Sequence, residues 1–474
     1  MRRQFLLLWI GQSVSQLGSQ VTLVALPLTA ILVLGASPTQ VGVLFAAGYL
    51  PAAAVGLLAG VWVDRLRRRP LLIACQTLQG LITLSVPLAA WLGTLAYQHL
   101  LVLQAINGAL MVVSIAAGLA FLPGLVGASH LTEANAKLAT SNAITRVAGP
   151  AFAGLLVQVL SAPLAIVADA ISFFFSAGCV AFIRTHEPSP IRKQRSVRSD
   201  IKEGIYLVLG HRLLRPLVLA LGTYNFFAAM FTAIYTLYMV RDLGLSPAGL
   251  GAVFACAGTG GVLGGLSAER VNRRFGTGRS IVGGAVLLAV MHLVAPLAVG
   301  PPVIAGLILA AAGMLAQLGF ALLQVNTATL LQQLVPAHAL GRVSATQQVV
   351  GLALVPIGAA LGGVLADSLG LRATVGLGAV GTTLAALTLL RSPVWSAAAP
   401  PELMEHNVDQ EQTHWQGYDY QRVWIWQSKA LRGFLNSPGL LALDLAGPPI
   451  ECSGPRARVR WSNVSTRSSA VAHK

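Results

Sequence analysis

Long apolar stretches, separated by short polar or basic breaks, recur along most of the chain. A helix needs about 20 largely apolar residues to cross a hydrocarbon core about 30 Å thick. Twelve stretches reach that length, so the pattern predicts an all-α membrane protein with twelve spans. The predicted spans are residues 4–34, 38–63, 71–92, 99–124, 138–160, 163–183, 213–241, 247–270, 280–299, 303–331, 342–367 and 371–392.

Charged side chains are scarce and unevenly placed along the sequence. They make up 10% of the 474 residues, against about 25% in a soluble domain, which argues against a soluble enzyme. Most Lys and Arg lie in every second loop, and this asymmetry marks the cytoplasmic side of a membrane protein. We therefore expect a multi-pass protein of the cytoplasmic membrane with both termini in the cytoplasm. The net charge of +16 then reports orientation, and no nucleic-acid partner is expected.

The second half of the chain repeats the first. The segment GASPTQVG at residues 35–42 recurs as GLSPAGLG at residues 244–251. The spacing of Gly, acid and Arg at residues 60–69 recurs at residues 265–274. This internal symmetry predicts two parallel six-helix halves with a substrate site between them, near the bilayer midplane.

The repeat divides the chain into four parts. They are an N-terminal half (1–183), a basic cytoplasmic linker (184–212), a C-terminal half (213–392) and a tail (393–474). The tail holds eight basic and seven acidic residues and five of the eight tryptophans, with little sustained apolar periodicity. We expect it to be a polar, disordered cytoplasmic extension. A divergent reading frame or an interaction segment of its own would look the same.

The loop between the second and third spans, GVWVDRLRRR at residues 60–69, resembles the signature loop of the major facilitator superfamily. That signature reads Gly-x-Leu-x-Asp-Arg-x-Gly-Arg-Arg or Lys, and here Trp62 and Arg67 stand where Leu and Gly are usual. The resemblance covers about residues 1–392 and implies the major facilitator fold of twelve transmembrane helices. The matching residues are Gly60, Asp64, Arg65, Arg68 and Arg69, with second copies at Gly265, Glu269, Arg270, Arg273 and Arg274.

Two further stretches resemble a bacterial efflux branch of that superfamily, which includes the enterobactin exporter and macrolide efflux proteins. They are LWIGQSVSQLG at residues 8–18 and GRVSA at residues 341–345. The resemblance implies export of a small amphipathic molecule (a drug, siderophore or metabolite) in exchange for protons, without enzyme activity. An importer or lipid flippase of the same fold, or a non-transporting membrane receptor or scaffold, is the alternative.

Acidic and basic residues at the cytoplasmic ends of opposite halves suggest a gate. Asp64 of the first half would meet Arg342 at the start of span eleven, and Glu269 would meet Lys137 at the equivalent place in span five. A carboxylate is favoured near a helix N-terminus and beside an arginine. We expect these two pairs to close the cytoplasmic side when the cavity opens outward. The alternative is that the loop charges only set topology.

Span five carries a short motif of small residues. Gly149, Pro150 and Gly154 resemble the antiporter motif of the superfamily, with Ala153 in place of a further glycine, and Pro356 is the expected counterpart of Pro150. A Gly-Pro pair permits a kink, and small residues let a neighbouring helix approach closely. A helix that is merely kinked and packed is an equally consistent interpretation.

Two ionisable residues inside predicted spans are the most informative, because a charge there is costly. Asp169 is about six residues into span six, and Arg146 lies on span five towards its cytoplasmic half. Because burial favours the protonated form of a carboxyl group, Asp169 is the candidate for proton coupling. Its alternative role is structural, as a partner for a neighbouring helix. Arg146 would stabilise an anionic substrate or the bundle interior.

Amide side chains mark a polar face of several spans, beginning with three glutamines at four-residue intervals in span one. A polar stripe facing lipid would leave its amides without hydrogen bonds. We therefore expect these side chains to face the central cavity and contact substrate; hydrogen bonds between helices are the alternative. The cavity candidates are Gln12, Gln16, Gln20, Gln104, Asn107, Arg146, Asn225, Gln324 and Asn326.

The sequence indicates neither metal nor cofactor chemistry. Its four cysteines are scattered, and no His/Glu or Cys pattern has metal-ligand spacing. We expect no cofactor, and a monomer in the lipid bilayer whose partners are a small-molecule substrate and protons.

Overall fold

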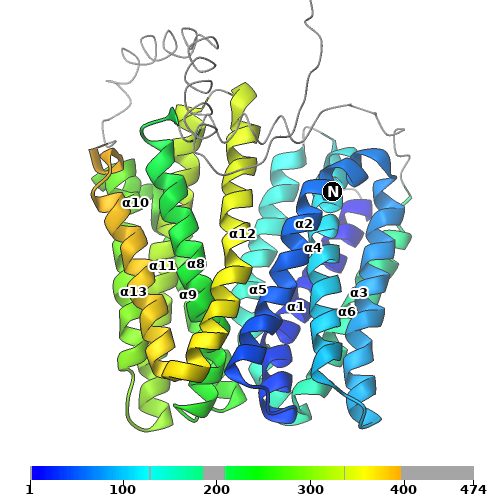
Figure 1. The fold of residues 1–474 in the computed structure, drawn as a ribbon. Helices are drawn as coiled ribbons and strands as arrows, with labels where there is room; N and C mark the ends of the chain where they lie inside the picture. Colours follow the sequence, from blue (N-terminus) through cyan, green and yellow to red (C-terminus); the bar gives the residue numbers. More distant parts are fainter. Residues whose placement is uncertain (1–2, 128–129, 185–207, 209, 336, 397–474) are drawn as a thin grey trace, which may run out of the picture. The chain divides into compact units, whose positions relative to one another are not determined.

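Twelve long helices form two bundles of six in the computed structural model, α1–α6 in one bundle and α8–α13 in the other (Figure 1). Each of the twelve is long and apolar enough to cross a membrane. The structure describes residues 3–127, 130–184, 208, 210–335 and 337–396. Within these ranges, the side chains of residues 57–62, 64–65, 337–342, 345 and 396 lie outside the description.

The helices of the N-terminal half are α1 (Arg3–Leu28, continued by the π-helical turn Thr29–Val33), α2 (Pro38–Arg65), α3 (Arg68–Trp91), α4 (Tyr97–Val126), α5 (Leu131–Leu160) and α6 (Ala162–Ala181). Those of the C-terminal half are α8 (Leu214–Arg241), α9 (Pro247–Phe275), α10 (Thr277–Val294), α11 (Pro302–Leu334), α12 (Ala337–Leu369) and α13 (Leu371–Leu390).

The twelve predicted spans are confirmed, and the predicted ends are least accurate where a helix continues beyond its apolar part. The largest difference is at the start of α5, predicted at residue 138 and observed at Leu131. The additional turns, LTEANAK, are polar. A polar helical extension carries no apolar signal, although Glu133 in its first turn suits the positive end of the helix.

The repeated Ser-Pro segments are helix starts. In the first copy the Ser37 hydroxyl accepts a hydrogen bond from the Gln40 amide at 3.2 Å, and the Gln40 side-chain oxygen accepts one from the Ser37 amide. In the second copy the Ser246 hydroxyl accepts from the Gly249 amide at 3.2 Å. Proline follows each serine at the first helical position, where a missing N–H costs nothing. The repeat therefore encodes the entry into α2 and α9.

The contacts between helices correct one part of the predicted repeat. A Cβ added to Gly251 would lie 2.5 Å from the carbonyl oxygen of Pro150, and one added to Gly42 would lie 2.5 Å from that of Ala359. Gly42 and Gly251 are repeat partners, so Ala359 is the structural counterpart of Pro150. The assignment of Pro356 is wrong by three residues, because the sequence match relied on proline alone.

The two ends of the bundles differ in charge. At one end lie the connection that carries Arg67, the start of α3 with Arg68 and Arg69, and the start of α10 with Arg279; we call it the basic end. At the other end lie the connections after α1 and α8, near residues 34–37 and 242–246; we call it the sealed end, because the two halves make close main-chain contacts there. In Figure 1 the basic end is uppermost.

Ser161 adopts a conformation that suits only glycine. Its φ of 86° and ψ of 158° match those of Gly127, Gly276 and Gly370, which also end helices. A side chain in this region costs about 1–3 kcal/mol. We expect Ser161→Gly to stabilise the protein by about 1 kcal/mol, since glycine's greater freedom when unfolded offsets part of the gain. Thermal unfolding in detergent measures the change, and an unchanged or lower midpoint would contradict it.

The last described residues extend the C-terminal half slightly beyond the predicted residue 392. Residues Pro393–Ser396 form a short 3₁₀ turn in which Val394 is fully buried. The carbonyl oxygen of Val394 lies against Gly278 of α10, where no Cβ would fit. Residues 393–396 therefore belong to the C-terminal half. The rest of the predicted tail, residues 397–474, lies outside the described residues.

Candidate functional site

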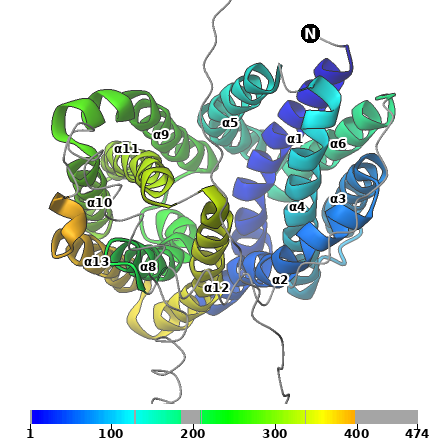
Figure 2. The same cartoon turned by 90° about the horizontal axis from the view of Figure 1, so that it is seen from above.

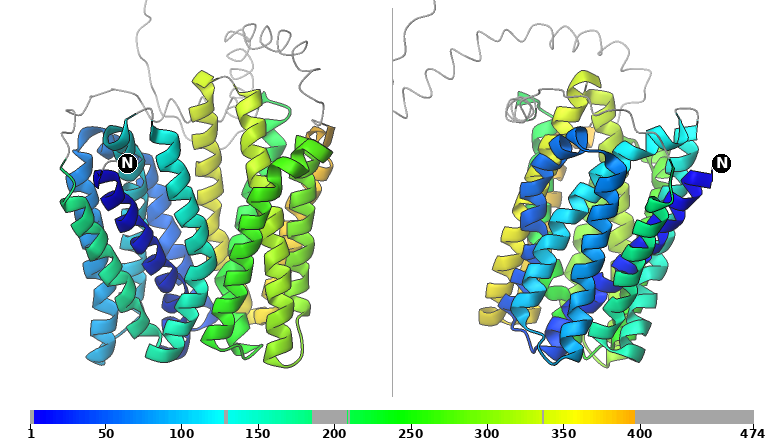
Figure 3. Two further views of the ribbon diagram at one scale, coloured as in Figure 1. Left: turned by 180° about the vertical axis from the view of Figure 1, so that it is seen from behind. Right: turned by 90° about the vertical axis from the view of Figure 1, so that its right-hand side faces the viewer.

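Two pairs of glycines bring the halves together at the sealed end. A Cβ added to Gly154 of α5 would lie 3.0 Å from the Cα of Gly251 of α9, and one added to Gly42 of α2 would lie 2.9 Å from the Cα of Gly363 of α12. Figure 2 shows these two helix pairs side by side, and Figure 3 shows α5 beside α9 from behind. Main chains this close leave no room for a solvent path between the paired helices.

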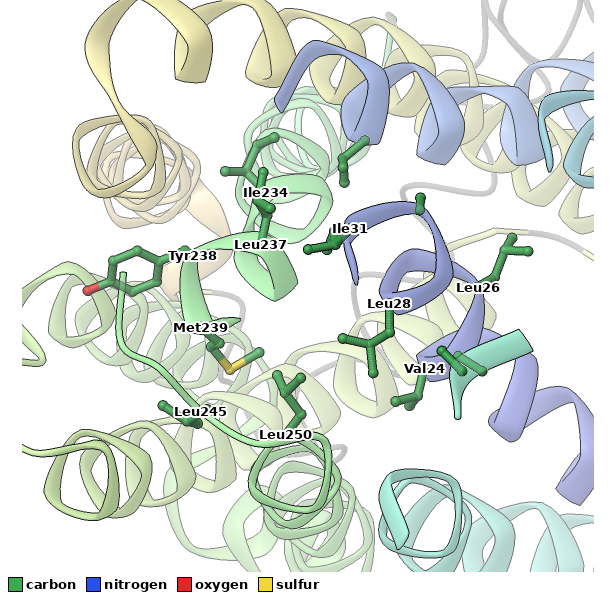
Figure 4. Packing of buried hydrophobic residues seen from close by; sticks show 14 of the residues in the cluster. Val24, Leu26, Leu28, Ile31, Ile234, Leu237, Tyr238, Met239, Leu245 and Leu250 are labelled. Atoms are coloured by element: carbon green, nitrogen blue, oxygen red, sulfur yellow. The ribbon is translucent and has the colours of Figure 1, made fainter. Parts of the chain in front are cut away.

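A shared apolar cluster lies beside these glycine contacts. Figure 4 shows Leu28 and Ile31 at the end of α1 together with Leu237 of α8 and Leu250 of α9, all in one buried cluster. Towards the basic end, the buried clusters belong to one half each. Two contain residues of the first half only, one with Phe5 and one with Cys75, and two contain residues after 207 only. Apolar packing between the halves is thus concentrated at the sealed end.

Helix starts of one half are capped by side chains of the other half. Asp367 of α12 accepts hydrogen bonds from the Thr39 amide of α2, at 3.0 Å, and from the Thr39 hydroxyl. Gln158 of α5 accepts from the Ala248 amide of α9 at 3.2 Å. Gln158 and Asp367 are repeat partners, as are Thr39 and Ala248, each pair 209 residues apart. The first amides of a helix lack partners within it, so these contacts stabilise the association of the two halves at this end.

A third polar contact joins the halves at this end. The Arg241 guanidinium of α8 donates to the carbonyl oxygen of Ala36 at 2.8 Å, and Arg372 of α13 donates to Ala298 at 3.4 Å. Both arginines line a surface depression that also contains Asp242. Arg241 and Arg372 are basic residues at the end opposite the basic end. Each holds a connection between helices in place through its bond to a carbonyl oxygen.

We expect Asp367→Ala to weaken the closure of the sealed end. Loss of a helix cap costs about 1 kcal/mol, which corresponds to about fivefold in the ratio of closed to open molecules. Asp367→Asn is the matched control, because its amide oxygen still accepts from Thr39. Distances between spin labels at positions 96 and 300 would measure the populations. Equal populations in the Ala variant and the wild-type protein would contradict the capping role.

At the basic end, Arg69 of the signature loop supports α6. Its guanidinium donates to the carbonyl oxygens of Val180 and Ala181, at 3.3 and 2.5 Å, where a cation also suits the negative end of the helix. Arg67 has a φ of −67°, so the two-residue connection between α2 and α3 does not require the glycine that is usual there. The side chains of Asp64 and Arg65, and the surroundings of Gly60, lie outside those described; Arg68 lies at the start of α3.

The second copy of the loop is exposed at the end of α9. Glu269 pairs with Arg273 at 3.6 Å, and Arg274 lies 5.6 Å above the ring of Phe275. A Cβ added to Gly265 would have no neighbour within 4 Å, and Arg270 is exposed. Lys137 pairs with Glu133 of its own helix at 3.2 Å. Of the predicted gate, Glu269 and Lys137 thus each pair within their own helix in this conformation, and the side chain of Arg342 lies outside those described.

Asp169 is buried between α6 and α1, with 2% of its surface exposed. The hydroxyls of Ser19 and Ser172 lie 3.4 and 3.3 Å from its Oδ1 atom. It packs directly on Gly18 of α1, where an added Cβ would lie 2.8 Å from Oδ1. No ion pair to Asp169 is found among the residues that the structure describes. An acid at this depth is bonded by neutral donors, an arrangement that can hold either protonation state.

The motif of span five lies between α1 and α9. Gly149 accommodates the side chain of Gln20, since an added Cβ would lie 2.6 Å from its Cγ atom. Pro150 and Gly154 face Gly251 across the halves. The exposed Arg146 bonds Asn142 on its own helix at 2.9 Å. The motif therefore provides close contacts on two sides of α5.

The amides of the predicted polar stripe contact several different helices. Four of them lie on glycines of neighbouring helices: Gln12 on Gly118, Gln20 on Gly149, Gln104 on Gly48 and Asn225 on Gly351. Two others bond locally or to an adjacent helix: Asn326 to the Leu322 carbonyl and Asn107 to the Thr83 hydroxyl. Gln16 has a buried Oε1 atom, and Gln324 is exposed. Most of these contacts match the alternative interpretation, in which the amides join helices.

The structure adds residues that the sequence reasoning missed. Tyr224 and Phe320 stack at 5.6 Å beside Gln324 and line a cavity of about 70 Å³ in the C-terminal half. His292 of α10 stacks on Phe231 at 4.6 Å and lies 3.3 Å from the Thr382 hydroxyl. An ionisable residue inside an apolar span was the available signal for His292.

Comparison with known proteins agrees with this architecture. A family model described as the Major Facilitator Superfamily matches residues 8–351 and 217–446. The multidrug efflux pump Tap of Mycobacterium tuberculosis (strain H37Rv) is 28% identical over 379 residues, which cover 75% of this chain and 85% of Tap. A Bacillus subtilis protein described as an uncharacterised MFS-type transporter, YvqJ, is 23% identical over 358 residues, covering 73% of this chain and 82% of that protein.

Solved structures of transporters share the fold. A bacterial homologue of the iron transporter ferroportin in its inward-facing state gives a TM-score of 0.67 at 18% identity, covering 83% of this chain and 99% of that one. The outward-facing form of a bacterial ferroportin homologue gives 0.56 at 16% identity, covering 84% and 100%. The nucleoside transporter NupG gives 0.64 at 14% identity, covering 82% and 98%.

Proposed function

The chain belongs to the major facilitator superfamily, and from this premise we propose that it exports a small amphipathic molecule across the cytoplasmic membrane in exchange for protons. The observation that carries the proposal is the unequal joining of the two halves. Glycine contacts, caps and apolar packing unite them at the sealed end. An arrangement closed at one end is one of the two states that alternating access requires.

The basic end is the cytoplasmic one in this proposal. Its connections carry most of the Lys and Arg, which favour the cytoplasmic side. Both termini then lie in the cytoplasm, and the structure corresponds to the state that receives substrate from inside the cell. Similarity to Tap, which is described as a multidrug efflux pump, supports export over import.

Asp169 is the proposed coupling group. It is buried in the first half next to α1 and has neutral hydrogen-bond donors around Oδ1. A charged carboxylate in this setting is costly, and a protonated one is not. Binding and release of a proton would therefore change how tightly α1 and α6 pack, and α1 also contributes Leu28 and Ile31 to the shared cluster at the sealed end.

The proposed cytoplasmic gate requires an exchange of ion-pair partners. In this conformation Glu269 pairs with Arg273, and Lys137 pairs with Glu133, on exposed helix surfaces. Exposed pairs of this kind contribute less than about 1 kcal/mol, so they give way easily when the halves approach. Glu269 would then meet Lys137, and Asp64 would meet Arg342.

We expect Asp64→Arg and Arg342→Asp each to reduce transport, and the double variant to restore part of it. Each single change places two like charges together, and the double change re-forms an opposite pair. Efflux of ethidium from cells measures the effect, normalised to correctly inserted protein. Failure of the double variant to recover any activity would contradict the pairing and favour the topological role of these charges.

Reconstitution into liposomes tests the proposed function. With ethidium as the probe, the proton exchanger should move protons in one direction across the membrane for ethidium moved in the other. A pH-sensitive dye inside the vesicles reports this movement. Ethidium and protons moving in the same direction would indicate an importer. The absence of any movement, for ethidium and for labelled lipids alike, would indicate a receptor or scaffold.

A further inference from the structure

The interior of the N-terminal half is unusually polar. The helices α1, α3, α4 and α6 contact one another in a ring, α1 with α6, α6 with α3, α3 with α4 and α4 with α1 (Figure 2). Within the described part of the chain, the buried side-chain atoms that have no protein hydrogen-bond partner all belong to these four helices. They include Ser13 Oγ, Gln16 Oε1, Gln76 Oε1, Asn107 Oδ1 and Ser176 Oγ, while the hydroxyls of Thr22 and Ser114 interact with Asp169 and Cys75.

Protein contacts alone do not account for so many polar atoms in one interior. Each buried polar atom without a partner costs about 1–3 kcal/mol, and a membrane offers no solvent at that depth. Gln76 and Ser176 show the burial clearly, with 6% and 0% of their surfaces exposed. Buried water normally supplies such partners, with each molecule making about three hydrogen bonds to otherwise unsatisfied groups.

These polar atoms adjoin Asp169 and continue from it towards the basic end. A Cβ added to Gly18 would meet Asp169 and Ser172, and one added to Gly11 would lie 3.2 Å from the Ser176 hydroxyl. Seven residues separate the two glycines on α1, a rise of about 10 Å. Because α1 begins at the basic end, this seam between α1 and α6 leads from Asp169 towards that end.

The C-terminal half has an apolar seam at the same place. At the offset of 209 residues, Gly18 corresponds to Phe227 and Ser172 to Gly381. The Phe227 ring of α8 lies against Gly381 of α13. In the first half the order is reversed, since the glycine is on α1 and the larger side chain, Ser172, is on α6. Phe231 lies likewise against Gly378, the counterpart of Asp169, with an added Cβ 3.0 Å from the Phe231 Cβ atom. The polar seam beside Asp169 is therefore a property of the first half and not of the fold.

We propose that the ring of α1, α3, α4 and α6 holds a chain of water molecules that carries protons between Asp169 and the region of Gln76 and Ser176, which lies nearer the basic end. The proposal rests on the proposed proton exchange at Asp169 and identifies its route. A proton leaves the Asp169 carboxyl for a neighbouring water, and each following water or serine hydroxyl accepts one proton and donates another. The amide oxygens of Gln16 and Gln76 accept hydrogen bonds and fix the orientation of these waters. No relay group changes its charge after the proton has passed.

The first test needs no substrate. Radiolysis of the full-length protein in nanodiscs generates hydroxyl radicals from bound water, which oxidise adjacent side chains. Cys179 lies on the seam beside Gly11 and is only 9% exposed. We expect Cys179 to be oxidised in the wild-type protein and at least several-fold more slowly in the Gln76→Leu/Ser176→Ala variant. Thr374→Val is the matched control, because its buried hydroxyl bonds its own helix in the other half. An unoxidised Cys179, or equal oxidation in the double variant, overturns the proposal.

The second test follows protons in liposomes with ethidium as the probe. We expect ethidium-linked proton flux to fall at least about tenfold in the double variant, while ethidium exchange without a proton gradient continues, because only the route is interrupted. Wild-type proton flux in the double variant overturns the route and leaves proton exchange intact. Absence of ethidium-linked proton flux in the wild-type protein overturns the exchange itself, and the proposed role of the water chain with it. If the double variant loses both proton flux and ethidium exchange, the rate of Cys179 oxidation decides whether the water chain is present.

Discussion

Replacing Gly154 with valine is expected to abolish transport by preventing closure of the sealed end. A Cβ at this position would lie 2.5 Å from the carbonyl oxygen of Pro247 and 3.0 Å from the Cα of Gly251. Both neighbours are main-chain atoms at the start of α9, so no side-chain rotation relieves the overlap. Valine adds two further methyl groups, and overpacking of this kind costs about 3 kcal/mol, or about 100-fold in the population of the closed state.

The repeat supplies a second variant with the same expected result. Gly363→Val places a side chain against the main chain of Thr39 at the start of α2. Gly178→Val on α6 is the matched control, because no atom lies within 4 Å of an added Cβ there. Ethidium efflux measures transport, and spin labels at positions 96 and 300 report whether the sealed end stays apart. Normal transport by Gly154→Val, with the protein correctly inserted, would show that the closed state is not part of the cycle.

Much of the fold could be predicted from the sequence because its signals are local. A span needs only sufficient apolar length, and the entries to α2 and α9 need only a serine followed by proline. The repeated segments at residues 35–42 and 244–251 combine both signals. The ends of α5 and the partner of Pro150 were less accessible, since polar helical turns have no apolar pattern and a single proline does not define a register.

The direction of the amides could not be predicted from their spacing. With 3.6 residues per turn, each four-residue step rotates a side chain by about 40°, so Gln12 and Gln20 point to directions about 80° apart. They accordingly contact different helices, α4 and α5. The caps formed by Asp367 and Gln158 could not be predicted either, because a polar residue near a helix end has many possible partners until the two halves are placed together.

The polar interior of the first half could be predicted from the sequence only in part. Gln76 and Thr83 lie seven residues apart on α3 and both are buried, which the polar spacing alone could have indicated. The contrast between Gly18 with Ser172 and Phe227 with Gly381 required the contacts, because each sequence position taken singly is ordinary. Comparing the two halves at equivalent contacts is what separates a feature of the fold from a feature of this transporter.

Asp169→Asn is expected to abolish proton-driven export while leaving exchange of ethidium across the membrane without a gradient largely intact. Asparagine has nearly the same shape and can still accept hydrogen bonds from Ser19 and Ser172 through its amide oxygen, so the packing on Gly18 is retained. It cannot bind and release a proton. Wild-type export should increase when the outside is made more acidic, because the proton gradient then favours entry, and export by the variant should not respond.

The matched control for this change is Asp242→Asn, an exposed carboxyl at the end of α8 on the sealed side. It should retain the wild-type response to the proton gradient, because its charge is in contact with solvent and lies outside the seam of α1 and α6. Export against a gradient by Asp169→Asn would assign coupling to another group. His292 would then be the next residue to replace, since it is the ionisable side chain that contacts Phe231 and Thr382 inside the other half. Loss of both export and exchange would instead favour the structural role of Asp169, in which its carboxylate holds α6 to α1.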